Sequence, residues 1–155
     1  MTRVSSHAAF LLALIGLCLG FSHKTTGLQL VQHFSNQSQV SCKAQNFSVF
    51  FKNYTESIAL QKQCIQTPLK KLMLIEDEDD LKPILKIIPP EQLTYPLILS
   101  TKQKAEQNLY LKIEISNNKK AKVTYFKPDT GYKIIYRFQS KKNHWHLIKI
   151  EDWSI

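Results

Sequence analysis

Few side chains in this sequence have the type and spacing that chemistry requires. His144 and His146 flank Trp145, so both imidazoles should lie on the same face of a strand. Such a pair can ligate a metal ion when a third ligand comes from elsewhere in the fold, but no residue stands at a fixed spacing that would supply it. We therefore expect no metal site and no cofactor, and His144 and His146 are the weak candidates against this expectation.

Motifs of common enzyme classes are also missing. The sequence has no nucleophile elbow, no His-Glu-x-x-His motif and no glycine-rich phosphate loop. The acidic run 76–80, EDEDD, lacks the spaced ligands, the glycine and the closing glutamate of an EF-hand calcium loop. We expect this run to be a solvated loop or a helix start, and we expect the protein not to be an enzyme.

The first residues indicate export. A short basic segment, whose only charged side chain is Arg3, precedes the uncharged apolar run 8–21, AAFLLALIGLCLGF. This run is shorter than the roughly 20 residues that span a bilayer, and small residues stand at Gly20 and Ser22. These features predict a cleaved signal peptide over residues 1–22 and a periplasmic or secreted protein, with a retained membrane anchor as the alternative.

The remaining chain keeps two cysteines, Cys42 and Cys64. A nucleophilic cysteine needs a nearby base, and no histidine lies near Cys64 in the sequence. A structural zinc site needs four cysteine or histidine ligands, and finger spacing is absent. Because exported proteins usually oxidise an even pair of thiols, we predict a Cys42–Cys64 disulfide.

Charge restricts the kinds of partner. The chain carries a net charge of +9, mostly from lysines scattered over its second half, and losing Arg3 with the signal peptide lowers it only to +8. In an exported protein such charge suits an anionic membrane surface, an anionic glycan or an acidic protein rather than nucleic acid. Alternatively, the positive charge serves only to keep the protein soluble. We expect no stable membrane span after cleavage of the signal peptide.

Residues 23–45 are polar, and we interpret them as a lead-in to a single domain over residues 46–155. Asn46 can cap a helix, and Thr55 or Ser57 can end it and start a second short helix through Gln63. Apolar side chains recur at helical spacing along one face, at Phe47, Phe50, Phe51, Tyr54 and Ile58.

The rest of the chain predicts strands. Residues 68–75 read as a strand, 80–93 as a connector with a short helix or turn, and 97–101 as a short strand. Alternating apolar residues then predict a four-strand antiparallel meander over 108–116, 121–127, 132–139 and 144–155. Helices followed by antiparallel strands are an α+β layout, in which the aromatic helix face, with Phe50, Phe51 and Tyr54, should pack on the sheet and meet Ile113 and Ile115.

Several positions resemble a small exported bacterial family of unknown function. The shared pattern comprises Phe47, Phe50-Phe51, Tyr54, Leu60-Gln61, Ile65, Pro68-Leu69 and the final WHLIKIEDWS. The resemblance covers residues 46 to the C-terminus and implies a cystatin-like, nuclear-transport-factor-2-like (NTF2-like) fold, with one or more helices on a curved antiparallel sheet. It brings no catalytic residues. Folds of this kind include isomerases that use a carboxylate in the open end of a cone, which here would come from Glu114, Glu151 or Asp152.

The leading hypothesis is a non-catalytic binding module for a small apolar ligand or a peptide. The third meander strand is apolar on both sides, with Ile135 opposite its aromatic face, so the sheet must be covered twice, enclose a cavity or dock on a partner. The alternatives are an immunity- or inhibitor-type interaction protein with a basic surface, and an isomerase- or hydrolase-like enzyme with a pocket carboxylate. The candidate ligand-binding residues are Tyr125, Tyr132, Tyr136 and Trp145, with Lys133 and Arg137 near the edge of the site.

Overall fold

The computed structural model describes residues 41–44, 46–78 and 80–155. The expected signal peptide and residues 23–40 of the polar lead-in lie outside the described residues. Three α-helices, one 3-10 helix and six strands follow one another in this order: α1 Phe47–Glu56, α2 Ile58–Gln63, β1 Ile65–Asp77, β2 Asp80–Ile88, η1 Pro90–Gln92, α3 Thr101–Glu106, β3 Tyr110–Ser116, β4 Lys120–Phe126, β5 Lys133–Lys141 and β6 His144–Asp152.

The two first helices begin where their capping residues predict. The Asn46 side chain accepts a hydrogen bond from the backbone amide of Ser48, and the Ser57 side chain accepts one from that of Leu60. These bonds satisfy amides that a helix leaves unpaired at its start. The break at Ser57 and the second short helix are therefore confirmed.

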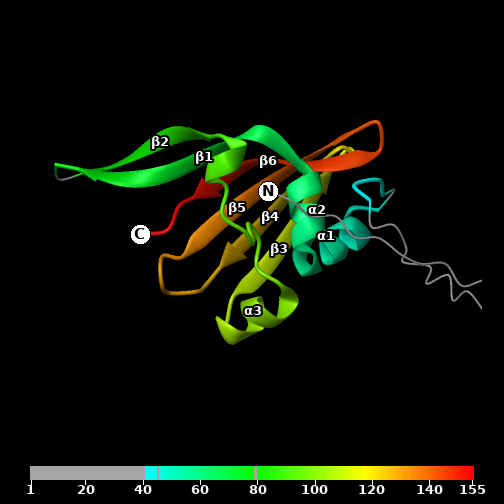
Figure 1. Cartoon of the computed structure of the whole chain (residues 1–155). Coiled ribbons are helices and arrows are strands. Elements are labelled where there is room, and N and C mark those ends of the chain that lie inside the picture. Colours follow the sequence, from blue (N-terminus) through cyan, green and yellow to red (C-terminus); the bar gives the residue numbers. More distant parts are fainter. Residues whose placement is uncertain (1–40, 45, 79) are drawn as a thin grey trace, which may run out of the picture. The chain divides into compact units, whose positions relative to one another are not determined.

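The six strands form one mixed sheet in the order β2-β1-β6-β5-β4-β3. The meander from β3 to β6 is antiparallel, as expected, whereas β1 joins β6 in parallel. The pairing of β1 with β6 ends where Met73 lies opposite Asp152, so the hairpin of β1 and β2 extends beyond β6 (Figure 1). Of the acidic run, Glu76 and Asp77 end β1 and Asp80 begins β2, so these three residues belong to strands rather than to the expected loop or helix start.

Alternation along the strands defines two faces of the sheet. The inner face carries Val123, Tyr136 and Ile150, which are buried. The outer face carries the residues between them, such as Lys122 and Arg137. The side chains of α1 pack on the inner face: Phe138 contacts Phe47, Phe50, Phe51 and Tyr54 with ring centroids 5.2 to 6.0 Å apart.

Two predicted segments differ from the structure. Residues 80–88 are a strand rather than a connector, although the short helix expected there exists as η1. Residues 97–100 are not a strand, and α3 begins at Thr101 with a capping box between Ser100 and Gln103. The backbone of Leu97 and Ile98 bonds instead to the side chain of Gln61, which removes the groups that a strand partner would use.

The edge strand β3 is covered less than expected. Ile113 packs against the core, but Ile115 is 47% exposed although it lies on the same face. The helices therefore do not reach the end of β3.

The predicted disulfide between Cys42 and Cys64 is present. Both cysteines also bond to β6, because the amide of Trp145 donates to the carbonyl of Cys42 and the amide of Leu147 donates to that of Cys64. Closing a loop of this size stabilises a domain by about 3 kcal/mol in the chain-entropy description. The bridge thus ties the segment before α1 to the sheet.

Within the described residues, no helix is both long enough and apolar enough to cross a membrane.

Candidate functional site

A pocket of about 350 Å³ opens on the inner face, between β1, β5 and β6 on one side and the segment after η1 on the other. We call it the inner pocket. Its apolar wall consists of Leu69, Ile88, Leu93, Leu97, Ile134 and Ile150. Ligand pockets in proteins typically measure about 300–1,000 Å³ and combine apolar walls with polar groups that orient the ligand. The inner pocket has this size, and its lining is mixed, because polar side chains stand beside the aliphatic ones: Lys71, Gln92, Thr94, Tyr136 and Asp152.

The two charged groups of the inner pocket form an ion pair. The Lys71 ammonium is 3.8 Å from the Asp152 carboxylate, and both side chains are about 30% exposed. Tyr136 also lines the pocket. Burial raises the pKa of the Tyr136 phenol above its ordinary value, and Tyr132, Tyr125 and Asp152 raise it further, so its hydroxyl stays neutral. The pocket therefore offers one ion pair and the neutral hydroxyl of Tyr136, besides Gln92 and Thr94, which also line it.

Gln61 holds in place the segment after η1, which forms one wall of the inner pocket. Its side-chain oxygen accepts hydrogen bonds from the amides of Leu97 and Ile98, at 2.7 and 3.2 Å, and its nitrogen donates to the carbonyl of Ile98 at 3.0 Å. Gln61 is fully buried. Nothing in its local sequence identifies this role, because its partners lie 36 and 37 residues away.

A second polar group lies near the inner pocket without a partner. The Tyr54 hydroxyl is buried and has no hydrogen-bond partner among the residues that the structure describes. Burial raises the pKa of Tyr54, and the neighbouring Tyr95 and Tyr136 add to the effect. This hydroxyl therefore stays neutral.

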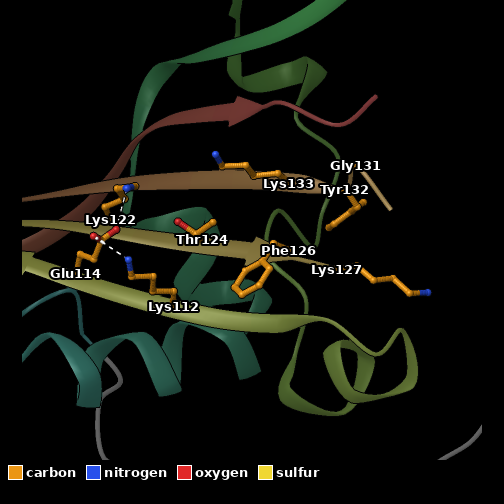
Figure 2. A pocket seen from close by; sticks show the side chains of 9 residues that line it. All are labelled: Lys112, Glu114, Lys122, Thr124, Phe126, Lys127, Gly131, Tyr132 and Lys133. Atoms are coloured by element: carbon orange, nitrogen blue, oxygen red, sulfur yellow. Dashed lines mark ion pairs between the residues drawn. The ribbon is translucent and has the colours of Figure 1, made fainter. Parts of the chain in front are cut away.

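The outer face carries a different hollow, of about 430 Å³, over β3, β4 and the start of β5. We call it the outer trough. Lys112 and Lys122 converge on Glu114 at 3.3 and 2.8 Å, and Lys133 lies across the trough on β5 (Figure 2). Thr124 lies between these lysines, and Phe126 stands at one end (Figure 2).

The predicted site residues divide between the two faces and the core. Tyr136 lines the inner pocket and Tyr132 borders the outer trough, where Lys133 also lies. Tyr125 belongs to the core, and its hydroxyl donates to the carbonyl of Leu99. Trp145 is core too, with its ring centroid 4.9 Å from that of Phe47.

Arg137 lies on the outer face and is bound by a carboxylate. Its guanidinium donates two hydrogen bonds to Glu151, at 2.6 and 3.0 Å, and the Lys149 ammonium lies 3.0 Å from the same group. Of the three carboxylates proposed for a pocket, Glu114 and Glu151 therefore lie on the outer face in ion pairs, and Asp152 lines the inner pocket.

The ion pairs of Glu151 with Arg137 and Lys149 should make the free energy of unfolding depend on pH. Burial alone would raise the pKa of Glu151, but the hydrogen bonds from Arg137 and Lys149 outweigh it and lower the pKa to about 2 from 4.5. The lowered pKa stabilises the fold fully above pH 4.5, and the contribution is lost as the pH falls toward 2. We expect a loss on the order of 2 kcal/mol, reduced by solvent screening at the half-exposed Arg137.

Urea unfolding of the parent and of Glu151→Gln at pH 2.5 and pH 6 measures this contribution. The variant should be less stable than the parent at pH 6 and close to it at pH 2.5. An equal difference at both values would show that the carboxylate charge is not what stabilises this pair.

His144 and His146 share the outer face, as expected from their spacing. Each ring has a backbone carbonyl as its neighbour: His144 Nδ1 lies 2.8 Å from Lys142 O, and His146 Nδ1 lies 3.2 Å from His144 O. In the described part of the chain, no group of three histidine, cysteine or acidic side chains could hold a metal ion.

The helices on one face of a curved sheet define an α+β fold, and similarity to a solved protein shows that the fold is NTF2-like. A solved NTF2-like protein from Bacteroides fragilis NCTC 9343 is similar to this chain, with a TM-score of 0.53 and 21% identity. The match covers 71% of this chain and 47% of the other, so the chain spans about half the length of that neighbour. No protein-family model matches the chain, and no curated protein matches it.

Proposed function

We propose that this protein is an exported, non-catalytic binding module that holds a small, largely apolar ligand in the inner pocket. The observation that carries the proposal is the composition of that pocket, which six aliphatic side chains line together with a single ion pair, Lys71–Asp152, and the neutral polar side chains of Gln92, Thr94 and Tyr136. An apolar body would contact the aliphatic wall, and one polar or charged group would meet the ion pair or the Tyr136 hydroxyl.

One feature supports binding without a reaction, and another supports export. Asp152 is the one carboxylate among the residues that line the inner pocket, and its nearest charged neighbour there is the Lys71 ammonium. No second carboxylate stands among the lining residues to work with Asp152 as an acid–base pair. The Cys42–Cys64 disulfide supports export, since such bridges persist in oxidising compartments.

Fluorescence of anilinonaphthalene sulfonate, which has an apolar body and one anionic group, tests the pocket directly. The parent should bind the dye, and Leu93→Trp, which fills the pocket, should weaken binding by about tenfold or more. Leu81→Trp places the same side chain on the outer face of β2, where Leu81 is 51% exposed, and should bind as the parent does. Thermal melting confirms that both variants fold.

Lys71→Met tests the polar end of the pocket. It should weaken binding of the anionic dye and leave binding of the neutral dye Nile red unchanged. Native mass spectrometry of protein purified from its own host should show a bound small molecule. Equal dye binding by Leu93→Trp and the parent would place the ligand elsewhere and overturn the proposal.

The basic outer face favours a second candidate, an immunity- or inhibitor-type protein that meets an acidic partner. The lysines of the outer trough are the observation behind it. Loss of a co-purifying acidic protein on Lys133→Glu, with dye binding intact, would support this second candidate.

A further inference from the structure

The outer trough is one of three adjoining hollows. A second hollow shares Glu114 and Lys122 with the trough, and a third shares Ile148 with the second. Together they form a continuous path over the outer face, from Phe126 on β4 to His146 on β6, which we call the outer groove. Because β4 alone has seven residues, the path along that strand is about 20 Å long.

The outer groove is strongly cationic. Seven lysine and arginine side chains line its three hollows, against one carboxylate, that of Glu114. Lys112 and Lys122 are paired with Glu114, and Arg137 with Glu151. Within the described residues, no ion pair engages the remaining cations, which are Lys120, Lys127, Lys133 and Lys141.

We propose that the outer groove binds a linear acidic polysaccharide. Alternate residues of a strand on the same face are about 6.6 Å apart, so the groove presents cations at repeated intervals rather than around one point. Such spacing suits a chain with many anionic groups better than a single phosphate ion. Phe126 offers a flat apolar surface to a sugar ring, and the Thr124 hydroxyl lies on the floor beside it.

Other occupants fit less well. An extended acidic peptide gains affinity by adding to a strand edge, whereas the cations of the groove lie on the outer face of the sheet, mostly on β4 and β5, which are hydrogen-bonded on both sides, and not along the free edge of β3. A second copy of this chain would oppose like charges across a two-fold axis. The disulfide indicates an oxidising compartment, where a polysaccharide is a more ordinary partner than a nucleic acid.

Binding to size-defined heparin fragments, measured by isothermal titration calorimetry at two salt concentrations, tests the proposal. The triple variant Lys120→Ala/Lys133→Ala/Lys141→Ala should lose about tenfold or more in affinity and show a weaker salt dependence. The control is Lys52→Ala/Lys86→Ala/Lys102→Ala, which removes the same charge from exposed positions outside the groove. It should bind heparin nearly as the parent does, and neutral dextran should not bind to any of the three proteins.

Three results would overturn the proposal. Equal losses of heparin affinity in both triple variants would show that heparin responds to the net charge of the protein and not to the groove. Tighter binding of poly-glutamate than of heparin would indicate an acidic protein partner, and tighter binding of oligo-dT would indicate a nucleic acid. Because the inner pocket lies on the other face, dye binding should be unchanged in the groove variant Lys120→Ala/Lys133→Ala/Lys141→Ala, so the outcome is independent of the proposed ligand pocket.

Discussion

Replacing Trp145 with alanine should reduce the free energy of unfolding by about 4 kcal/mol, the usual range for a buried aromatic being 3–5 kcal/mol. Trp145 is 2% exposed; it meets Phe47 edge to face at a centroid distance of 4.9 Å and stacks with Phe50 at 6.5 Å. Its indole nitrogen donates to the carbonyl of Ala44 at 3.2 Å, beside the disulfide. Truncation would leave a cavity where the helices, the sheet and the bridge meet.

Urea unfolding followed by circular dichroism measures this loss. Leu85→Ala is the control, because Leu85 is 55% exposed on the outer face of β2 and its truncation should change stability by roughly 0.5 kcal/mol or less. Trp145→Phe should fall between the two, since it keeps the ring contacts and loses the bond to Ala44. If Trp145→Ala lost less than 1 kcal/mol of unfolding free energy and no longer bound the dye, Trp145 would be a ligand-binding residue rather than a core residue.

Gln61→Leu should destabilise the fold by about 3 kcal/mol. It should also detach from Gln61 the segment after η1, which forms one wall of the inner pocket. The substitution conserves most of the volume but removes three hydrogen bonds to Leu97 and Ile98. Ile98 is fully buried, and each buried backbone group left unpaired costs about 1–3 kcal/mol.

Hydrogen exchange separates this local effect from a general loss of stability. The amides of Leu97 and Ile98 should exchange faster in Gln61→Leu by more than the global change explains, and dye binding should weaken. Gln63→Leu is the matched control, because Gln63 ends the same helix with an exposed side chain and should change neither quantity. Normal protection of both amides in Gln61→Leu would show that Gln61 does not hold the segment.

Local signals in the sequence were sufficient for several elements. The caps at Asn46 and Ser57 act within three residues, and the aromatic stripe of α1 repeats at helical spacing, so both could be predicted without knowing the fold. The meander was predictable because apolar and polar side chains alternate from one residue to the next along a strand, a pattern that can be read without knowing the fold. The fold class followed from this order of elements and from the resemblance to NTF2-like proteins, and the solved neighbour supports it.

Long-range contacts decided what the sequence could not show. The strand β2 contains Pro83, which ordinarily interrupts a sheet, but β2 is an edge strand, where a missing amide is tolerated. Residues 97–100 have the apolar composition of a strand, yet Gln61 takes their backbone groups from 36 residues away.

The candidate site shows the same division. Alternation places Tyr136 and Arg137 on opposite faces of β5, so the sequence determined that these two residues point apart. It could not determine which aromatic side chains line a pocket, because a core tyrosine and a pocket tyrosine share the same spacing. That distinction depends on what covers each residue: α1 covers Trp145, whereas Tyr136 borders the space that the segment after η1 leaves open.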